Sequence, residues 1–455
     1  MAKCFHEKFI LQMQELLGEE ESQQLFDALN DDAAVSVRIN NRKKSSMYNS
    51  EENAIVTWCR NGRYLEERPN FTLIPQLHSG CFYVQDASSM IYEEILGRLV
   101  GDSDVPVNYL DMCAAPGGKT TAAINVLPTK SLVVANEYVA QRANILKENL
   151  QKWGSPDVIV TNSSSDKLAA LNGLFDIVAV DAPCSGEGMM RKDDEAVRQW
   201  SPDLVSQCAS LQWEILTDIW NVLKKDGYLI YSTCTFNRRE NELMVERICE
   251  ELGGETVDMQ FPAEWGIIPG KQTQQHCYRF MPHRTRGEGL FVSVIKKNSE
   301  HATFRIKQKK NNSTIKSFDS DWLIDKKEYS YFQIGEMICA LRTSHVPIYT
   351  AITQVAKIMQ TGIELATEKR KDMIPQHALS QSWELNETAF PQVELDYPTA
   401  IAYLRRENIL LPDASPKGYV IVTYDGFPLG FVKNLGNRSN NLYPQEWRIR
   451  NANIK

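Results

Sequence analysis

Between residues 76 and 298 the chain repeats one pattern, in which a short apolar run is followed by a stretch of helix length. The pattern predicts six strands, at residues 107–110, 132–135, 158–161, 177–180, 228–232 and 290–295. Strands that alternate with helices form a mostly parallel sheet, because each helix returns the chain to the starting edge and covers one face. We therefore expect an α/β core in this region.

The residues before this core predict a small α/β cap at 1–75. Its first segment is amphipathic, with Phe5, Phe9, Met13 and Leu16 spaced for one face of a helix. Two helices and one strand are expected in the cap, at 5–17, 20–29 and 34–39.

The residues after the core divide into two further parts. Residues 299–372 begin with a polar stretch rich in Lys, Asn and Ser, which predicts a linker and then a small connecting module. Short strands with turns run from 373 to 455, and Asp425 and Gly426 form one turn signal. The two clearest strands lie at 418–424 and 429–433. This part is therefore predicted to be a β-rich C-terminal domain.

Composition narrows the environment of the protein. The chain has 455 residues and a formal charge of −8, which disfavours a general nucleic-acid coat but allows a local basic patch. It contains no apolar run of about 18 residues and no secretory signal, so we expect neither a membrane span nor export. Its 10 cysteines lack zinc-ligand spacing, so we expect reduced thiols, a cytoplasmic location and no bound metal. A monomer is expected.

Two groups of basic residues leave their roles open. Arg284 and Arg286 can grip phosphates or lie in a solvated turn. A second group can contact RNA or form a solvated linker. It consists of Lys296, Lys297, Arg305, Lys307, Lys309, Lys310 and Lys316, with Glu300 as the single acid among them.

A glycine-containing run at 111–120 follows the first core strand and precedes a helix. Such a turn lets the backbone approach a ligand, and ligands of open parallel sheets bind at the carboxyl ends of the strands. By itself, the run also fits an ordinary tight turn between strand and helix. Glu137 follows the second strand, where a carboxylate can accept hydrogen bonds from both hydroxyls of a ribose. No GxGxxG or GxxxxGK[ST] sequence occurs, which disfavours a hydride-transfer enzyme and an NTPase.

Two cysteines follow core strands at the same edge of the sheet. Asp181 and Cys184 come after the strand at 177–180, and Cys234 comes after the strand at 228–232. Methylation at carbon 5 of cytosine needs a nucleophile at carbon 6, an acid near nitrogen 3 and a base for the carbon 5 proton. A thiolate suits the addition to carbon 6 because it is polarisable and partly ionised near neutral pH. These three side chains supply the set that the chemistry needs.

At these residues the sequence resembles the Sun-type RNA cytosine-5 methyltransferases, and within them the bacterial RsmF-like branch, which acts on 16S ribosomal RNA. The resemblance covers nearly the whole chain, and its motifs occur in order. They lie at residues 80–86, 111–120, 181–188, 232–235, 240–242 and 287–291. The C-terminal residues 418–430 and 441–450 are similar to the PUA-like RNA-binding domain of this branch.

The resemblance implies a Rossmann-like methyltransferase core and a role for each site residue. Glu137 would hold the cofactor ribose, and Asp181 would contact both the cofactor and the cytosine ring. Cys234 would be the nucleophile, and Cys184 would assist proton removal and release of the product. The loop that would wrap S-adenosyl-L-methionine consists of Cys113, Ala114, Ala115, Pro116, Gly117, Gly118 and Lys119. The implied partner is 16S ribosomal RNA, free or within the 30S subunit.

The sequence departs from the family pattern after the third core strand. The family often has an aspartate there, near the cofactor adenine, whereas this chain has Ser164 at that position and Asp166 close by. Either residue can contact the adenine. The rival interpretation of the whole chain is a noncatalytic RNA-binding assembly factor that keeps the methyltransferase fold, and the intact cysteine pair disfavours it.

Overall fold

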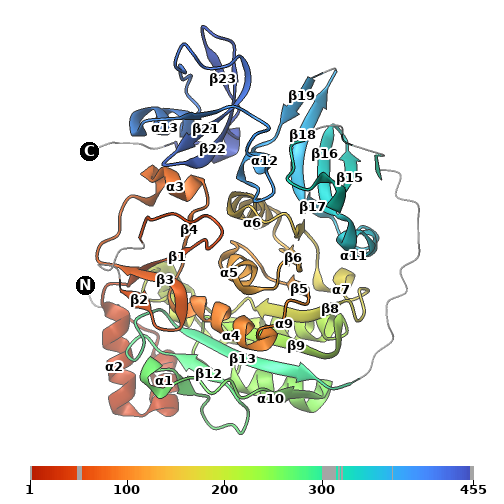
Figure 1. Cartoon of the computed structure of the whole chain (residues 1–455). Helices are drawn as coiled ribbons and strands as arrows, with labels where there is room; N and C mark the ends of the chain where they lie inside the picture. Colours follow the sequence, from red (N-terminus) through yellow and green to blue (C-terminus); the bar gives the residue numbers. More distant parts are fainter. Residues whose placement is uncertain are drawn as a thin grey trace.

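A computed structural model describes residues 3–48, 54–299, 314–315, 318, 321–370 and 372–450. Four β-sheets run through these residues, and the largest forms the core of the molecule (Figure 1). Within the described residues, no helix combines the length and the apolar character needed to cross a bilayer.

The core sheet has ten strands in the order β11-β12-β13-β9-β8-β5-β6-β7-β17, with β10 paired to β13. All six strands that the sequence predicts between residues 76 and 298 are present. The five central strands pair in parallel: β7 (Val158–Thr161), β6 (Leu132–Asn136), β5 (Asn108–Asp111), β8 (Phe175–Asp181) and β9 (Leu223–Thr233). The sixth, β13 (Leu290–Lys297), runs antiparallel to β9. The core is therefore Rossmann-like, with a parallel centre and antiparallel edges.

Four edge strands of this sheet were not predicted from the sequence. They are β10 (Gly254–Thr256), β11 (Ile268–Pro269), β12 (Tyr278–Phe280) and β17 (Ile358–Thr361). Each has two to four residues, and none is a continuous apolar run of the kind that predicted the six core strands.

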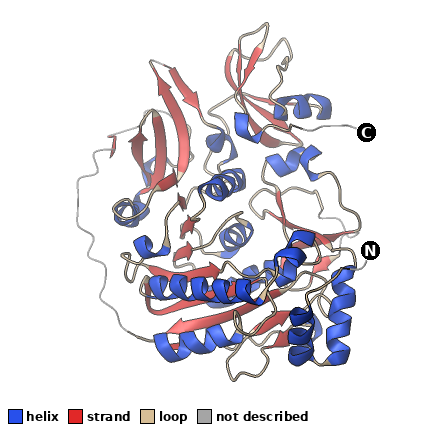
Figure 2. Ribbon diagram, turned by 180° about the vertical axis from the view of Figure 1, so that it is seen from behind, coloured by secondary structure: helices blue, strands red, loops and turns tan. Residues whose placement is uncertain are grey.

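Helices cover both faces of the core sheet, as Figure 2 shows from behind. Neighbouring residues of β5 point to opposite faces, so Tyr109 belongs to one hydrophobic cluster and Leu110 to the other. The first cluster includes side chains of α4 (Ile91–Val100), α5 (Gly118–Val126) and α6 (Ala140–Trp153). The second includes side chains of α7 (Ser165–Leu168), α9 (Pro202–Trp220), α10 (Glu242–Leu252) and α11 (Val346–Ile352). Burial on both faces explains why the strands read as continuous apolar runs.

The N-terminal part packs two helices and a small antiparallel sheet against this core. The elements predicted at 5–17, 20–29 and 34–39 are confirmed within two residues as α1 (Glu7–Leu17), α2 (Glu19–Asn30) and β1 (Val35–Ile39). The expected apolar face of α1 is buried at Phe9, Met13 and Leu16. The sheet order is β2 (Ile55–Val56), β3 (Cys59–Leu65), β1 and β4 (Phe82–Val84), and α3 (Pro75–His78) lies between β3 and β4 in the chain.

Two further sheets follow the core in the chain. The first joins β14 (Thr314–Ile315), β15 (Tyr329–Ile334), β16 (Met337–Arg342), β18 (Ile363–Lys369) and β19 (Asp372–Pro375). The second joins β20 (Gln392–Glu394), β21 (Gly418–Tyr424), β22 (Phe427–Asn434) and β23 (Ser439–Asn441), accompanied by α12 (His377–Gln381) and α13 (Tyr397–Leu404). The two C-terminal strands predicted around Asp425 are confirmed as β21 and β22. The N-terminal sheet extends past residue 75 and β19 spans residue 373, so the division into domains at those positions stays a prediction.

The connecting module is attached to the core by backbone pairing. Its strand β17 pairs antiparallel with β7 and so extends the core sheet at that edge. Because β7 would otherwise end the sheet, this pairing satisfies backbone groups that an open edge leaves exposed.

The basic stretch at 296–316 lies mostly outside the described residues, which exclude Glu300, Arg305, Lys307, Lys309, Lys310 and Lys316. Lys297 is fully buried and donates hydrogen bonds to the carbonyl oxygens of Trp220 at 2.8 Å and Leu223 at 3.0 Å. Burial lowers its pKa to about 8. For Lys297 both open interpretations are therefore wrong, because it is a structural group of the core rather than part of a linker or an RNA surface. Lys296 pairs with Asp226 at 3.1 Å.

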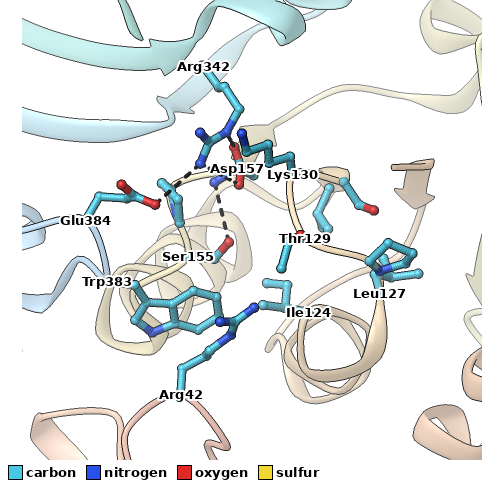
Figure 3. A pocket seen from close by; sticks show the side chains of 14 residues that line it. Arg42, Ile124, Leu127, Thr129, Lys130, Ser155, Asp157, Arg342, Trp383 and Glu384 are labelled. Atoms are coloured by element: carbon cyan, nitrogen blue, oxygen red, sulfur yellow. Dashed lines mark hydrogen bonds and ion pairs between the residues drawn. The ribbon is translucent and has the colours of Figure 1, made fainter. Parts of the chain in front are cut away.

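A cavity of about 200 Å³ lies at the amino ends of β6 and β7, opposite the edge where the sequence places the site (Figure 3). Residues from the N-terminal part, the core, the connecting module and the C-terminal part line it, among them Arg42, Lys130, Asp157, Arg342, Trp383 and Glu384. The buried side chain of Asp157 accepts hydrogen bonds from Arg342 at 2.8 Å and is 2.9 Å from His345 Nε2. Burial raises the pKa of Asp157, but the bonds from His345 and Arg342 hold it below its usual value.

We expect Asp157→Asn to destabilise the protein by about 3 kcal/mol, because the buried guanidinium of Arg342 then loses the negative charge that it pairs with. The contribution of Asp157 is present above its unfolded-state pKa and is lost as the pH falls through the lowered folded-state pKa. The difference in the free energy of unfolding between variant and wild type should therefore vanish in acid. Urea unfolding at several pH values measures this difference. The control Glu251→Gln, at an exposed helix pair with Arg247, should change stability by less than about 0.5 kcal/mol. Equal effects of the two variants would contradict this role.

Candidate active site

The loops at the carboxyl ends of the parallel strands form one rim, and the run at 111–120 lies at its centre after β5. Gly117 adopts a left-handed conformation with φ of 108°, which an L side chain rarely adopts. A Cβ atom on Gly117 would also lie 3.3 Å from Leu146 Cδ1. The loop is held from outside, because Arg142 donates to the Ala115 carbonyl and Asn149 to the Pro116 carbonyl, each at 2.8 Å.

The remaining residues of the loop differ in how deeply they are buried. Cys113 is half-buried, Ala114 is buried, and the Ala114 N–H donates to the Asn136 carbonyl at 2.8 Å. Burial raises the pKa of the Cys113 thiol far above its usual range, so this thiol is neutral. Gly118 begins α5, and Lys119 follows it with its ammonium turned back toward the rim.

Glu137 follows β6 directly and is 4% exposed. Its carboxylate accepts a hydrogen bond from the Val139 N–H at 2.8 Å and lies 3.7 Å from the Arg142 guanidinium. A carboxylate has lone pairs for about four hydrogen bonds, so capacity remains for a ligand diol. The acidic acceptor beside a glycine turn fits the ribose and amino-acid parts of S-adenosylmethionine.

Ser164 and Asp166 both lie just after β7, at the same rim. Ser164 precedes the first turn of α7, and its hydroxyl bonds the exposed Asp166 carboxylate and lowers the pKa of that group. The two candidates for the adenine contact are thus linked to each other. Asn136 fixes this corner, because its side chain donates to the carbonyls of Met112 at 3.1 Å and Ser163 at 2.9 Å.

Asp181 is the last residue of β8, and both of its carboxylate oxygens are engaged. Oδ2 is 2.6 Å from Lys119 Nζ, and Oδ1 accepts from the Ser232 hydroxyl at 2.7 Å. Ser232 in turn meets the buried Tyr92 hydroxyl at 2.9 Å. Burial lowers the pKa of Lys119, but the Asp181 carboxylate raises it overall, so the lysine carries a proton beside Asp181.

Cys184 and Cys234 meet at this rim. Their sulfur atoms are 3.1 Å apart, although the residues are 50 positions apart in the chain. The hydrogen bond to Cys234 raises the pKa of Cys184 well above its usual range, and burial and the nearby charges of Cys234 and Glu240 add to the effect. A further buried carboxyl, that of Asp111, lies at the end of the neighbouring strand β5. Burial raises the pKa of Asp111 to about 7, against the opposing hydrogen bond from Thr120.

Arg38 is a residue of this site that sequence reasoning missed. It is fully buried in β1 and donates from Nη2 to the Gly118 carbonyl at 3.0 Å and to the Thr121 hydroxyl at 2.5 Å. The same guanidinium pairs with the buried Glu93 at 3.2 Å. The N-terminal part thereby holds the first turn of α5. No local sequence signal announces this role, since Arg38 sits in an otherwise ordinary strand pattern.

Arg284 and Arg286 have partners within the protein. Arg284 Nε donates to Glu21 of α2 at 2.5 Å, and the Arg286 guanidinium lies over the Tyr64 ring at 4.3 Å. The structure therefore places both side chains against the N-terminal part. Within the described residues, no group of three or more His, Cys, Asp or Glu side chains is arranged to hold a metal ion.

The site fits methyl transfer. It combines a glycine turn after the first parallel strand, a buried acid after the second, and an acid beside paired thiols after the fourth and fifth. The fold and the site thus define an S-adenosylmethionine-dependent methyltransferase. Comparison with known proteins narrows the class. Residues 102–296 match the family model of 16S rRNA methyltransferase RsmB/F, residues 5–87 match the N-terminal domain of 16S rRNA methyltransferase RsmF, and residues 390–449 match the methyltransferase RsmF PUA domain.

The chain belongs to this family of rRNA methyltransferases. It is 30% identical over 413 residues to ribosomal RNA small subunit methyltransferase F of Shewanella loihica, with 86% of this chain and 83% of the relative covered. It is also 30% identical to the protein of the same description from Escherichia coli, with 86% and 84% covered.

Solved structures agree with the fold. A methyltransferase homolog protein from Pyrococcus horikoshii is 25% identical with a TM-score of 0.55, and the match covers 64% of this chain and 95% of that one. NSun6 from the same organism, at 18% identity and a TM-score of 0.57, covers 66% of this chain and 100% of its own.

We expect Glu137→Gln to weaken S-adenosylmethionine binding about tenfold, because a charge-assisted hydrogen bond to a ribose hydroxyl becomes a neutral one. The variant keeps the shape of the side chain and an acceptor for Val139. Isothermal titration calorimetry measures the dissociation constant. Glu195→Gln, at an exposed pair with Arg198 on α8 (Asp194–Gln199), should leave it unchanged. Unaltered affinity of the Glu137 variant would remove Glu137 from the cofactor site.

Proposed function

We propose that the protein methylates carbon 5 of a cytosine in 16S ribosomal RNA through a covalent adduct with Cys234. The observation that carries the proposal is the 3.1 Å contact between Cys184 and Cys234 at the rim that also holds Asp181 and the glycine loop. Methyl transfer to a nitrogen or an oxygen of RNA needs no such pair of thiols, whereas carbon 5 of cytosine needs a nucleophile and a base together.

The first step is attack of the Cys234 thiolate on carbon 6 of the ring. The cytosine has to leave its stack to reach the rim. As the Sγ–C6 bond forms, electron density moves to carbon 5 and toward nitrogen 3. The pair of Lys119 and Asp181 supplies a proton to nitrogen 3, because Lys119 keeps a proton 2.6 Å from the carboxylate. Ser232 holds the other carboxylate oxygen, so Asp181 has one defined orientation.

The residues from Cys113 to Lys119 and Glu137 would hold S-adenosylmethionine, which would supply the methyl group that carbon 5 accepts. Release then requires loss of the carbon 5 proton. Cys184, once its own proton has passed to water, takes that proton, and the C5–H electron pair forms the C5–C6 double bond. The C6–Sγ electron pair returns to Cys234, and nitrogen 3 gives its proton back to the Asp181–Lys119 pair. One proton leaves to solvent in each cycle.

The proposal includes the setting of the reaction. The substrate is 16S ribosomal RNA, free or within the 30S subunit, in the cytoplasm, and the enzyme acts as a monomer without a metal ion. The match of residues 390–449 to a PUA domain supports a separate RNA-binding part. We further propose four domains, at residues 1–75, 76–298, 299–372 and 373–455. Either Ser164 or Asp166 contacts the adenine.

Cys184→Ala should accumulate a covalent enzyme–RNA adduct, because attack by Cys234 continues while release is blocked. Cys234→Ala should form none. Denaturing gel electrophoresis with 16S RNA and S-adenosylmethionine shows the adduct as a slower band. Cys249→Ala, at a half-buried helix position, is the matched control and should behave as wild type.

The opposite pattern, an adduct with Cys234→Ala alone, would show that the two roles are reversed. A wild-type protein that binds the cofactor but transfers no labelled methyl group to RNA would instead favour a noncatalytic assembly factor. Bisulfite sequencing of 16S RNA from cells with and without the gene identifies the cytosine.

A further inference from the structure

The carboxylate of Glu240 joins the two loops that carry the cysteines. Glu240 is fully buried, and all four of its hydrogen-bond donors are neutral groups. Oε2 accepts from the Ser185 N–H at 3.0 Å and from Gln212 Nε2 at 2.8 Å. Oε1 accepts from the Ser185 hydroxyl and from Asn237 Nδ2 at 2.6 Å. Ser185 directly follows Cys184, and Asn237 lies three residues after Cys234, so one carboxylate fixes both loops.

The same network reaches the backbone on the other side of Cys184. Gln212 of α9 donates to the Pro183 carbonyl at 2.9 Å as well as to Glu240, and its amide oxygen accepts from the buried Tyr231 hydroxyl at 3.1 Å. Residues 183 and 185 are therefore both fixed, directly or through Gln212, by Glu240. The backbone on both sides of Cys184 is thereby held beside the Cys234 loop.

The charge of Glu240 also acts on Cys184. Contact with Cys234 and burial are the larger causes of the raised pKa of Cys184, and the Glu240 charge adds to them. Burial raises the pKa of Glu240 itself, against hydrogen bonds from Ser185 and Asn237 that favour the ionised form. A carboxylate with neutral partners in a low-dielectric interior influences nearby groups more strongly than one paired with a cation.

We propose that Glu240 is a positioning residue for the proposed reaction, which holds the Cys184 loop against the Cys234 loop. The inference rests on the proposed function only for its consequence in catalysis. Cys184 can take the carbon 5 proton only from a fixed place beside Cys234, so loss of the hydrogen bonds from Glu240 should slow release of the adduct more than attack.

Glu187 offers a matched comparison. It is also fully buried between the two loops, and its carboxylate accepts from the backbone N–H groups of Phe236 at 2.6 Å and Asn237 at 2.8 Å. Trp200 Nε1 donates to it at 2.9 Å and Gln12 of α1 at 3.0 Å. Glu187 thus anchors the chain after Cys234 to the N-terminal part, and its carboxylate does not bond the residues flanking Cys184.

The first test measures the Cys184 thiol without RNA. In a Cys234→Ser background, alkylation of Cys184 by iodoacetamide is followed from pH 6 to pH 11 by peptide mass spectrometry. Glu240→Gln should raise the rate below pH 9, because loss of the nearby negative charge lowers the Cys184 pKa. Glu240→Asp, which keeps the charge, should restore the wild-type profile, and Glu187→Gln should leave it unchanged.

An unaltered alkylation profile in folded Glu240→Gln overturns the proposal, and so does an equal shift in Glu187→Gln. Should Glu240→Gln fail to fold, Gln212→Met removes the bonds from Gln212 to the Pro183 carbonyl and to Glu240, and it should slow release of the adduct in the second test by a smaller factor. Unaltered release in that variant also overturns the proposal. Circular dichroism establishes folding.

The second test measures release with both cysteines present. In single turnover with 16S RNA, Glu240→Gln should form the adduct at the wild-type rate and release it about tenfold more slowly, so the adduct accumulates. A shifted thiol profile with no adduct from any variant would refute the proposed function and leave the action of Glu240 on Cys184 standing. Equal slowing of formation and release would show a merely structural role.

Discussion

The parallel pairing of β8 with β9 is the interaction on which the site depends. In its register Asp181 lies opposite Ser232, so the two strands end together and their following loops start from the same level. A shift of one residue would turn Ser232 away from Asp181 and send the two cysteine loops to different heights, because side chains alternate between the faces of a sheet. The 3.1 Å contact between the sulfurs is a consequence of this ladder.

Buried carboxylates hold the loops that the ladder brings together. Glu187 and Glu240 bind the backbone and side chains around the cysteines, and Glu242 forms a fully buried pair with Arg279, which also donates to the Phe236 carbonyl. Each carboxylate is costly to bury, and each is compensated by several hydrogen bonds. Such a network permits one arrangement of the loops, because any other leaves a charge without partners. The two loops that carry the cysteines are therefore held rigidly at the rim.

The N-terminal part and the connecting module contact the core and stabilise its loops and its edge. Arg38 of the N-terminal sheet binds the first turn of α5, which follows the glycine turn. On the opposite side β17 extends the core sheet, and Arg342 and His345 enclose Asp157 at the amino ends of the strands. The glycine loop and the core sheet are thus supported by elements distant in the chain.

The sequence by itself determined the core and proposed the members of the candidate site. Alternating apolar runs gave all six predicted core strands, because a strand buried on both faces needs an apolar residue at nearly every position. Strand ends located Asp181, Cys184, Cys234 and Glu137, since parallel strands share one carboxyl edge. The family resemblance, which carried the roles of these residues, agrees with the matched family models.

Only the tertiary structure decided which side chains support them. Arg38 lies 80 residues from Gly118, and Glu240 lies 55 residues from Ser185, so no local pattern links the partners. The same holds for Lys297, which reads as part of a solvated basic stretch but is buried beneath Trp220. A charged residue in a sequence predicts an exposed side chain, because charges are rarely buried without a partner. Which partner is present depends on how the chain packs, and the order of residues alone does not show it.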